Sequence, residues 1–136
     1  MSKRKLPPAS DWRNRNIDDW NTTTFTNYLQ DKHREQFGIE YAPMRSWRME
    51  QGQIGSLIGT RTKEGTHSKA TVKAFIDEAF KTYQPTQQYP GTNFGFIYAY
   101  RRNILQRLEA EEVAKERREQ AQESIEQDFD ELSSWL

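Results

Sequence analysis

The stretch SKATVKAFIDEAFKTY, residues 68–83, decides the fold class. Apolar side chains recur in it at the three- and one-residue intervals of an amphipathic helix, at Val72, Phe75, Ile76, Ala79, Phe80 and Tyr83. Polar side chains occupy the other side, at Lys69, Lys73, Asp77 and Lys81. Pro85 follows, and proline cannot continue a helix. The stretch therefore predicts a helix that packs one face on a core.

Two more helices are expected before this stretch. Asn21 and Thr22 are good N-caps for a first helix, and Gly38 is a typical C-terminal stop. A second helix is expected near residues 45–60, with one apolar side made of Trp47, Ile54, Leu57 and Ile58. The glycines at positions 52, 55 and 59 each cost about 0.5–1 kcal/mol relative to alanine. They predict either a close helix approach or a bent segment.

One long final helix is expected after the loop that contains Pro85, Pro90 and Gly91. Thr92 or Asn93 caps it, and its expected buried stripe is Phe94, Ile97, Tyr98, Tyr100, Ile104, Leu105 and Leu108. Beyond Leu108 the strong helix formers Ala, Glu, Arg and Gln predominate, so the helix should continue out of the domain. Strand-like alternation never persists. The sequence thus predicts an all-α fold, a compact bundle of about four helices with a long protruding C-terminal helix.

Composition divides the chain into three regions. Residues 1–10 are expected to form a flexible basic arm, residues 11–108 a helical domain, and residues 109–136 a charged helical extension with an acidic amphipathic tail. The net charge is zero, but residues 1–110 hold 17 basic and 11 acidic side chains, a net +6, and residues 111–136 hold 3 and 9, a net −6. Such asymmetry indicates two different partners, or a basic body neutralised by its own tail.

Side chains typical of catalysis are sparse. The absence of cysteine excludes disulfides, thiolate metal sites and cysteine nucleophiles. The two histidines, His33 and His67, lie in different segments without helical pairing. The run GQIGSLIGT, residues 52–60, lacks the lysine of a phosphate-binding loop. We therefore expect no enzymatic activity, no metal and no cofactor.

Basic residues in three places predict contacts to the phosphates of DNA. The arm contributes Lys3, Arg4 and Lys5. The span around the second and third helices contributes Arg45, Arg48, Arg61, Lys63, Lys69 and Lys73, and the final helix contributes Arg101, Arg102 and Arg107. The alternative is that these charges only solvate an amphipathic fold.

The tail predicts a protein-docking surface. Its apolar positions recur every three or four residues among carboxylates, and the expected partner-binding residues are Ile125, Phe129, Leu132, Trp135 and Leu136. A helix of this kind can dock into an apolar groove rimmed by lysine and arginine. Two alternatives stay open, that the tail packs on its own domain or that it forms a homodimeric coiled pair.

Residues 20–108 resemble a helical module of phage and plasmid replication proteins, which include replisome organisers and helicase-loader-like proteins. The residues that carry the resemblance are Phe25, Tyr28, Leu29, Phe37, Gly38, Tyr41, Ala42, Pro43, Trp47, Gly52, Ile54, Leu57, Ile58, Val72, Phe75, Ile76, Asp77, Phe80 and the span 94–108. The module has a lysine-rich helix after its glycine, and Gln51-Gly52-Gln53 departs from that pattern. The resemblance implies an accessory role in replication without enzymatic activity.

Taken together, these patterns predict a phage-type DNA replication accessory protein. Its basic body would contact DNA, and its C-terminal helix would hold a helicase, clamp, polymerase or single-strand-binding protein. Two alternatives are a transcription co-activator or inhibitor that binds host RNA polymerase, and an oligomeric structural virion component. No apolar run approaches the roughly 20 residues of a membrane span, so we expect no membrane association and a location in the (host) cytoplasm.

Overall fold

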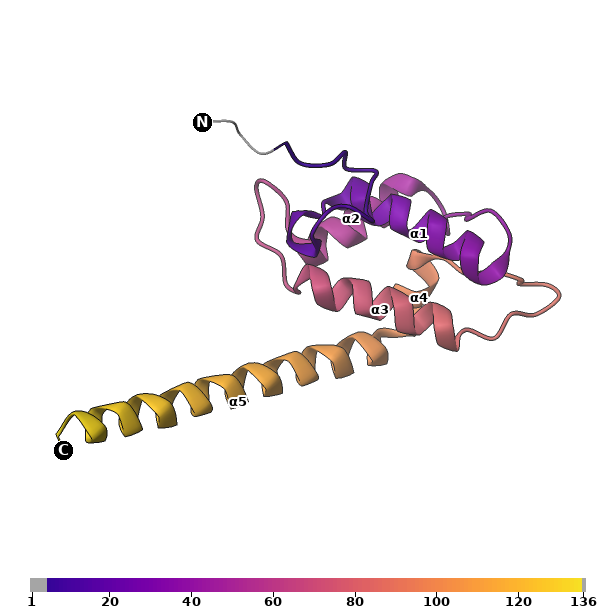
Figure 1. Cartoon of the computed structure of the whole chain (residues 1–136). Helices are drawn as coiled ribbons and strands as arrows, with labels where there is room; N and C mark the ends of the chain where they lie inside the picture. The colour runs from indigo at the N-terminus through magenta and orange to yellow at the C-terminus, as the bar shows by residue number, and fades with distance from the viewer. Residues whose placement is uncertain (1–4, 136) are drawn as a thin grey trace.

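The computed structural model describes residues 5–135 and confirms the all-α fold. Five α-helices follow one another, α1 (Thr22–Phe37), α2 (Trp47–Ile58), α3 (Lys69–Thr82), α4 (Phe94–Tyr100) and α5 (Arg102–Ser134). A short 3-10 turn, η1 (Ile17–Asp19), precedes them. Within the described residues there is no strand, only an isolated bridge between Gly59 and Glu64. Helices α1 to α4 form a compact body, and α5 leaves it as a long rod (Figure 1).

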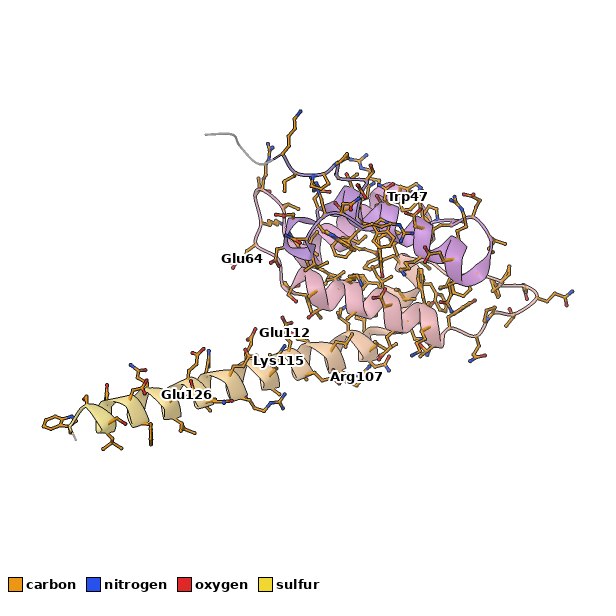
Figure 2. All side chains as sticks on the ribbon, in the orientation of Figure 1. Trp47, Glu64, Arg107, Glu112, Lys115 and Glu126 are labelled. Carbon is orange, nitrogen blue, oxygen red and sulfur yellow. The ribbon has the colours of Figure 1, made fainter. Side chains whose placement is uncertain are left out.

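The body surrounds a core rich in aromatic rings. Its fourteen buried apolar residues come from η1's flank and from every α-helix, and they are Trp20, Phe25, Tyr28, Leu29, Ile54, Leu57, Val72, Phe75, Ile76, Ala79, Phe80, Phe94, Ile97 and Leu105. The segment before α1 covers this core, because the Trp12 ring packs edge-on against Trp20 and Tyr28. Side chains fill the space between the ribbons of the body (Figure 2).

Polar side chains at the helix ends explain where α1, α2 and α3 begin. The Asn21 side chain accepts the Thr24 N–H in a capping box. The Ser46 and Ser68 side chains accept the Met49 and Thr71 N–H groups at the starts of α2 and α3. Gly38 closes α1 in the left-handed region, at φ 73°, where a side chain would be strained. The second helix is two residues shorter at each end than the expected 45–60, and the third matches 68–83 to within one residue.

The expected single final helix is wrong, because the chain breaks at Arg101. This residue has φ −123° and ψ 26°, which is not helical, and it separates α4 from α5. The break turns Tyr100 outward, so that it is 67 % exposed instead of buried. No glycine or proline marks the position. The reason lies in packing, since α4 contacts α2 while α5 lies across α3.

A buried carboxylate fixes α4 to α2. Glu50 is fully buried and accepts the Met44 N–H at 2.9 Å, the Gly95 N–H at 3.0 Å and the Tyr41 hydroxyl. Tyr41 in turn accepts the Phe94 N–H at 2.8 Å. Gly95 is required at this approach, because a Cβ there would lie 2.8 Å from Met44 Cβ. Burial and the neighbouring Glu50 carboxylate raise the pKa of Tyr41 above its usual range.

Only the first part of α5 belongs to the body. Leu105 is buried, and Glu112 accepts the Thr71 hydroxyl of α3 at 2.5 Å. From Val113 to Trp135 every residue is exposed. The outer half of α5 is therefore a single helix in solvent (Figure 1).

Candidate functional site

The predicted DNA-contacting residues do not converge on one patch. Arg45 and Arg48 lie at the start of α2, whereas Arg61 and Lys63 lie in the loop that follows its end. A helix of 12 residues is about 18 Å long, so these two pairs occupy opposite ends of the body. Arg101 lies at the break between α4 and α5.

Four of the predicted residues bind groups of this chain. Lys69 donates to the Asp18 carbonyl at 2.8 Å, and Lys73 lies 3.0 Å from an Asp77 oxygen. The Arg102 guanidinium lies 4.1 Å from the centre of the Tyr98 ring and donates to the Tyr98 carbonyl. Arg107 pairs with Glu78 and with Glu111, and hydrogen bonds to these two carboxylates raise its pKa. The charged ends of these four side chains therefore already have partners within the chain.

Another group of basic residues is exposed. Within the described part of the chain, no ion pair or side-chain hydrogen bond occupies the charged ends of Lys5, Arg45, Arg48, Arg61, Lys63 and Arg101. These side chains are the candidates for phosphate contacts. Lys3 and Arg4, which the sequence also predicts, lie outside the described residues.

An aromatic groove beside α4 is a feature that the sequence prediction missed. It has a volume of about 440 Å³ and is lined by Met44, Tyr83, Tyr89, Gly91, Thr92, Asn93, Phe96 and Tyr100. The Thr92 hydroxyl is buried and has no hydrogen-bond partner among the described atoms. Arg45 and Arg101 each follow a lining residue in the chain, Met44 and Tyr100 respectively. The aromatic density of residues 83–100 was the available signal, but the assumption of one continuous helix assigned Tyr100 to the core.

A second hollow lies at the opposite end of the body. Its volume is about 550 Å³, and it is bounded by the first residues of α1 and by the loop that joins α2 to α3. Arg61, Lys63 and Lys69 line it together with Glu64. The carboxylate reduces the positive charge there, so this hollow is a weaker anion site than its three basic residues suggest.

The predicted partner-binding residues lie on the outer half of α5. Ile125, Phe129 and Leu132 are each more than two-thirds exposed, and Trp135 is 88 % exposed. The tail therefore does not pack on its own domain in this structure. Leu136 lies outside the described residues. Residues 119–136 hold six acidic side chains and no basic one.

Both histidines have hydrogen-bond partners within the chain. His33 is buried, with Nδ1 3.0 Å from the Ile39 carbonyl oxygen, and its Nε2 accepts the Thr92 N–H at 3.3 Å. His67 lies 3.2 Å from a Glu109 oxygen. Across residues 5–135, no cluster of histidines and carboxylates has the geometry of a metal site. In the same range no helix is both long enough and apolar enough to cross a membrane.

Comparisons with protein-family models, with curated proteins and with solved structures give no match.

Proposed function

We propose that this protein is a non-enzymatic accessory factor of phage-type DNA replication. In this proposal the helical body binds DNA, and α5 binds a protein of the replication machinery, such as a helicase, clamp, polymerase or single-strand-binding protein. Joining two weak contacts in one molecule raises their effective concentration without any chemical step.

One observation carries the proposal, namely that the positively charged and the negatively charged regions of the chain occupy separate surfaces. The exposed arginines and lysines without an ion pair before residue 102 lie on the body, and Lys115, Arg117 and Arg118 lie on α5 just beyond it. The carboxylates of residues 119–136 surround an apolar stripe farther along the same helix. A basic body neutralised by its own tail would need the tail to fold back on the body. The exposure of Phe129 and Leu132 argues against that alternative.

The aromatic groove supports DNA as the ligand of the body. Proteins that bind unpaired nucleic acid combine cations for the backbone with aromatic rings on which bases stack. Tyr89 and Tyr100 are both more than 60 % exposed at the groove, and the exposed Arg45 and Arg101 each follow a lining residue in the chain. The two components therefore lie at the same end of the body.

A salt titration with a labelled single-stranded oligonucleotide tests this function. Each phosphate contact on a single strand contributes a slope of about −0.7 to the plot of log K against log salt. The double variant Arg45→Gln/Arg101→Gln should bind more weakly and lose about 1.4 from the steepness of that slope. The control Lys81→Gln/Lys115→Gln removes the same charge elsewhere and should leave the slope unchanged. Absence of binding by the unaltered protein at low salt would contradict the proposed DNA contact.

A further inference from the structure

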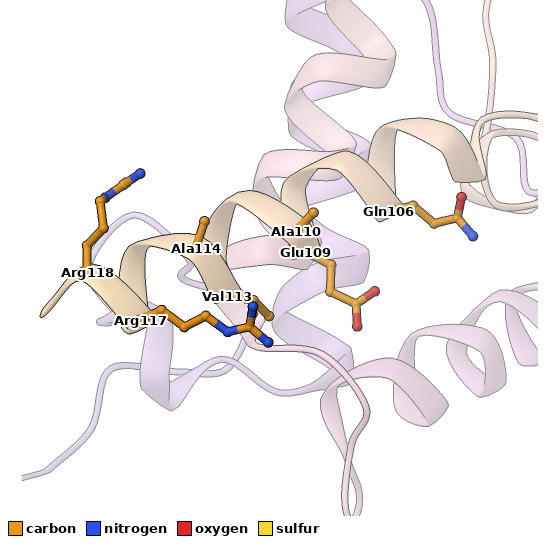
Figure 3. Close-up of a pocket in the computed structure, with 7 residues that line it drawn as sticks. All are labelled: Gln106, Glu109, Ala110, Val113, Ala114, Arg117 and Arg118. Atoms are coloured by element: carbon orange, nitrogen blue, oxygen red, sulfur yellow. The ribbon is translucent and has the colours of Figure 1, made fainter. Parts of the chain in front are cut away.

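The aromatic groove beside α4 has walls from four segments of the chain. These are Met44 before α2, Tyr83 just after α3, residues 89–93 of the next loop, and Phe96 and Tyr100 on α4. The hollow on α5 differs, because all of its lining residues belong to that one helix (Figure 3). That hollow has a volume of about 530 Å³, and no aromatic ring lines it. The groove therefore surrounds a ligand from several sides, whereas the hollow on α5 offers a single helix face.

Hydrogen bonds hold the loop wall of the groove in place. The buried His33 accepts the Thr92 N–H at 3.3 Å, and the Tyr83 hydroxyl donates to the Tyr89 carbonyl at 2.9 Å. Gly91 fits directly against His33, where a Cβ would lie 2.5 Å from Nε2. This wall is thus formed by contacts within the chain, and a largely preformed wall is typical of small-ligand sites.

Aromatic rings and the absence of acidic side chains define the chemistry of the groove. The Phe96 ring centre lies 5.0 Å from that of Tyr100 and 6.1 Å from that of Tyr83, and Tyr100 is 67 % exposed. No carboxylate lines the groove, in contrast to the hollow at the other end of the body, which includes Glu64. Such a surface fits a flat aromatic group carried on an anionic backbone. Aromatic side chains bind single nucleic-acid strands in this way, by stacking on the bases.

Asn93 adds a hydrogen-bond donor with a fixed direction. Its Oδ1 accepts the Phe96 N–H at 2.8 Å, so the amide cannot turn over without losing this bond. Its Nδ2 has no acceptor among residues 5–135. In the same wall, the buried hydroxyl of Thr92 has no partner among the described atoms. The wall therefore has unpaired polar groups for the edge of a base, and bases taken out of the stack are bound by stacking and by hydrogen bonds to their edges.

We propose that the groove holds one unpaired nucleobase of a DNA strand, stacked on the Tyr100 ring and hydrogen-bonded at its edge by Asn93 Nδ2. Arg45 and Arg101 each follow a lining residue, and neighbouring Cα atoms are about 3.8 Å apart, so both arginines start beside the groove and bind phosphates of the same strand. Neighbouring bases cover the faces of a base within a duplex, so the protein binds a single strand in preference to a duplex. This inference rests on the proposed function for the DNA contact, and it adds the form of DNA that the groove accepts.

Changing the DNA tests the base site without altering the protein. Three labelled ligands with equal numbers of phosphates are compared at one salt concentration, namely a single strand, a hairpin duplex and a single strand with a stable abasic residue at every position. The intact single strand should bind about tenfold more tightly than either of the others, because only its bases are free to stack. Equal or tighter binding of the duplex or of the abasic strand would overturn the base site alone. Binding of none of the three would contradict the DNA contact of the proposed function itself.

Two variants test the residues that hold the base. Tyr100→Ala should weaken binding of the intact strand about tenfold and leave binding of the abasic strand unchanged. Tyr100→Phe is the matched control, because it keeps the ring, and it should bind like the unaltered protein. Asn93→Ser keeps an oxygen that caps α4 but removes the amide donor, so it should weaken binding of the intact strand alone, by about threefold.

The comparison of the two strands separates a base contact from a general defect. An unfolded variant loses affinity for the intact and the abasic strand alike, whereas a variant without the base contact loses affinity for the intact strand only. No loss with Tyr100→Ala, or equal losses for both strands in a variant whose circular dichroism spectrum is unaltered, would overturn the base site. The salt slope of the Arg45→Gln/Arg101→Gln variant then still tests the proposed function independently.

Discussion

Phe25, Phe75 and Phe94 are fully buried in the body, whereas Phe129 on the outer half of α5 is 68 % exposed. Both regions are helical, but they form for different reasons. The helices of the body are held by packing on one another around the buried core, while the outer half of α5 depends on the helix preference of Ala, Glu, Gln and Arg. The comparison shows that the body buries its apolar side chains within itself, whereas the outer half of α5 leaves its apolar side chains exposed.

The largest expected difference is between two phenylalanines. Phe75→Ala should reduce the free energy of unfolding of the body by about 3–5 kcal/mol, because it leaves a cavity in a closely packed core. Phe129→Ala should leave that free energy within about 0.5 kcal/mol of its original value, as for a surface substitution. Urea unfolding followed by near-ultraviolet circular dichroism measures both. A large loss of stability with Phe129→Ala would mean that the two regions unfold as one unit.

The next largest loss of stability is expected from removing the buried carboxylate of Glu50. Glu50→Ala removes the acceptor of the Met44 and Gly95 N–H groups and of the Tyr41 hydroxyl, and each unsatisfied donor costs about 1–3 kcal/mol. We expect a total loss of about 2–4 kcal/mol, with the relaxation of α4 reducing the sum. The exposed Glu126 on α5 is the control, and Glu126→Ala should change the stability of the body by less than about 0.5 kcal/mol. The same urea unfolding experiment compares the two variants.

Alkaline pH should weaken the body through its buried tyrosines. Burial and a hydrogen bond to Asp77 raise the pKa of Tyr28, and burial beside Glu50 raises that of Tyr41. Above about pH 10 the unfolded chain loses these protons while the folded chain keeps them, so the unfolding free energy falls by up to about 1.4 kcal/mol per pH unit for each group. Unfolding measured between pH 9 and pH 11 (about one unit on either side of the ordinary tyrosine pKa) should show this slope. Tyr28→Phe should reduce it, and an unchanged slope would assign the effect to other groups.

The smallest effect concerns helix propensity in the outer half of α5. Gln120→Gly should cost about 1 kcal/mol of local helix stability and lower the helical circular dichroism signal. It should not change the urea midpoint of the body, because no described residue beyond Glu112 is covered by the body. A dilute sample keeps this measurement free of self-association. A shifted midpoint would show that α5 transmits stability to the core.

The local sequence pattern was sufficient to predict the positions of α1 and α3. Asn21, Gly38 and Ser68 act over three or four residues, so the caps that they form follow from the sequence. The break at Arg101 did not follow, since it satisfies the packing of α4 on α2 and of α5 on α3 and uses no helix-breaking residue. Glu50 is a similar case. A glutamate inside an amphipathic segment is usually solvated, and only the approach of α4 makes it a buried acceptor.

The candidate site was predictable in its residue types but not in its arrangement. The charge division of the chain and the exposed stripe of the tail are periodic or compositional, and the sequence contains both directly. Whether Lys69 meets the Asp18 carbonyl, or whether Met44 and Tyr100 line one groove, depends on contacts between distant segments. The helical class, the caps and the amphipathic tail were thus determined by the sequence alone, because neighbouring residues decide them. The broken final helix, the buried Glu50 and the aromatic groove were decided by the tertiary structure, because each requires side chains from separate helices to meet.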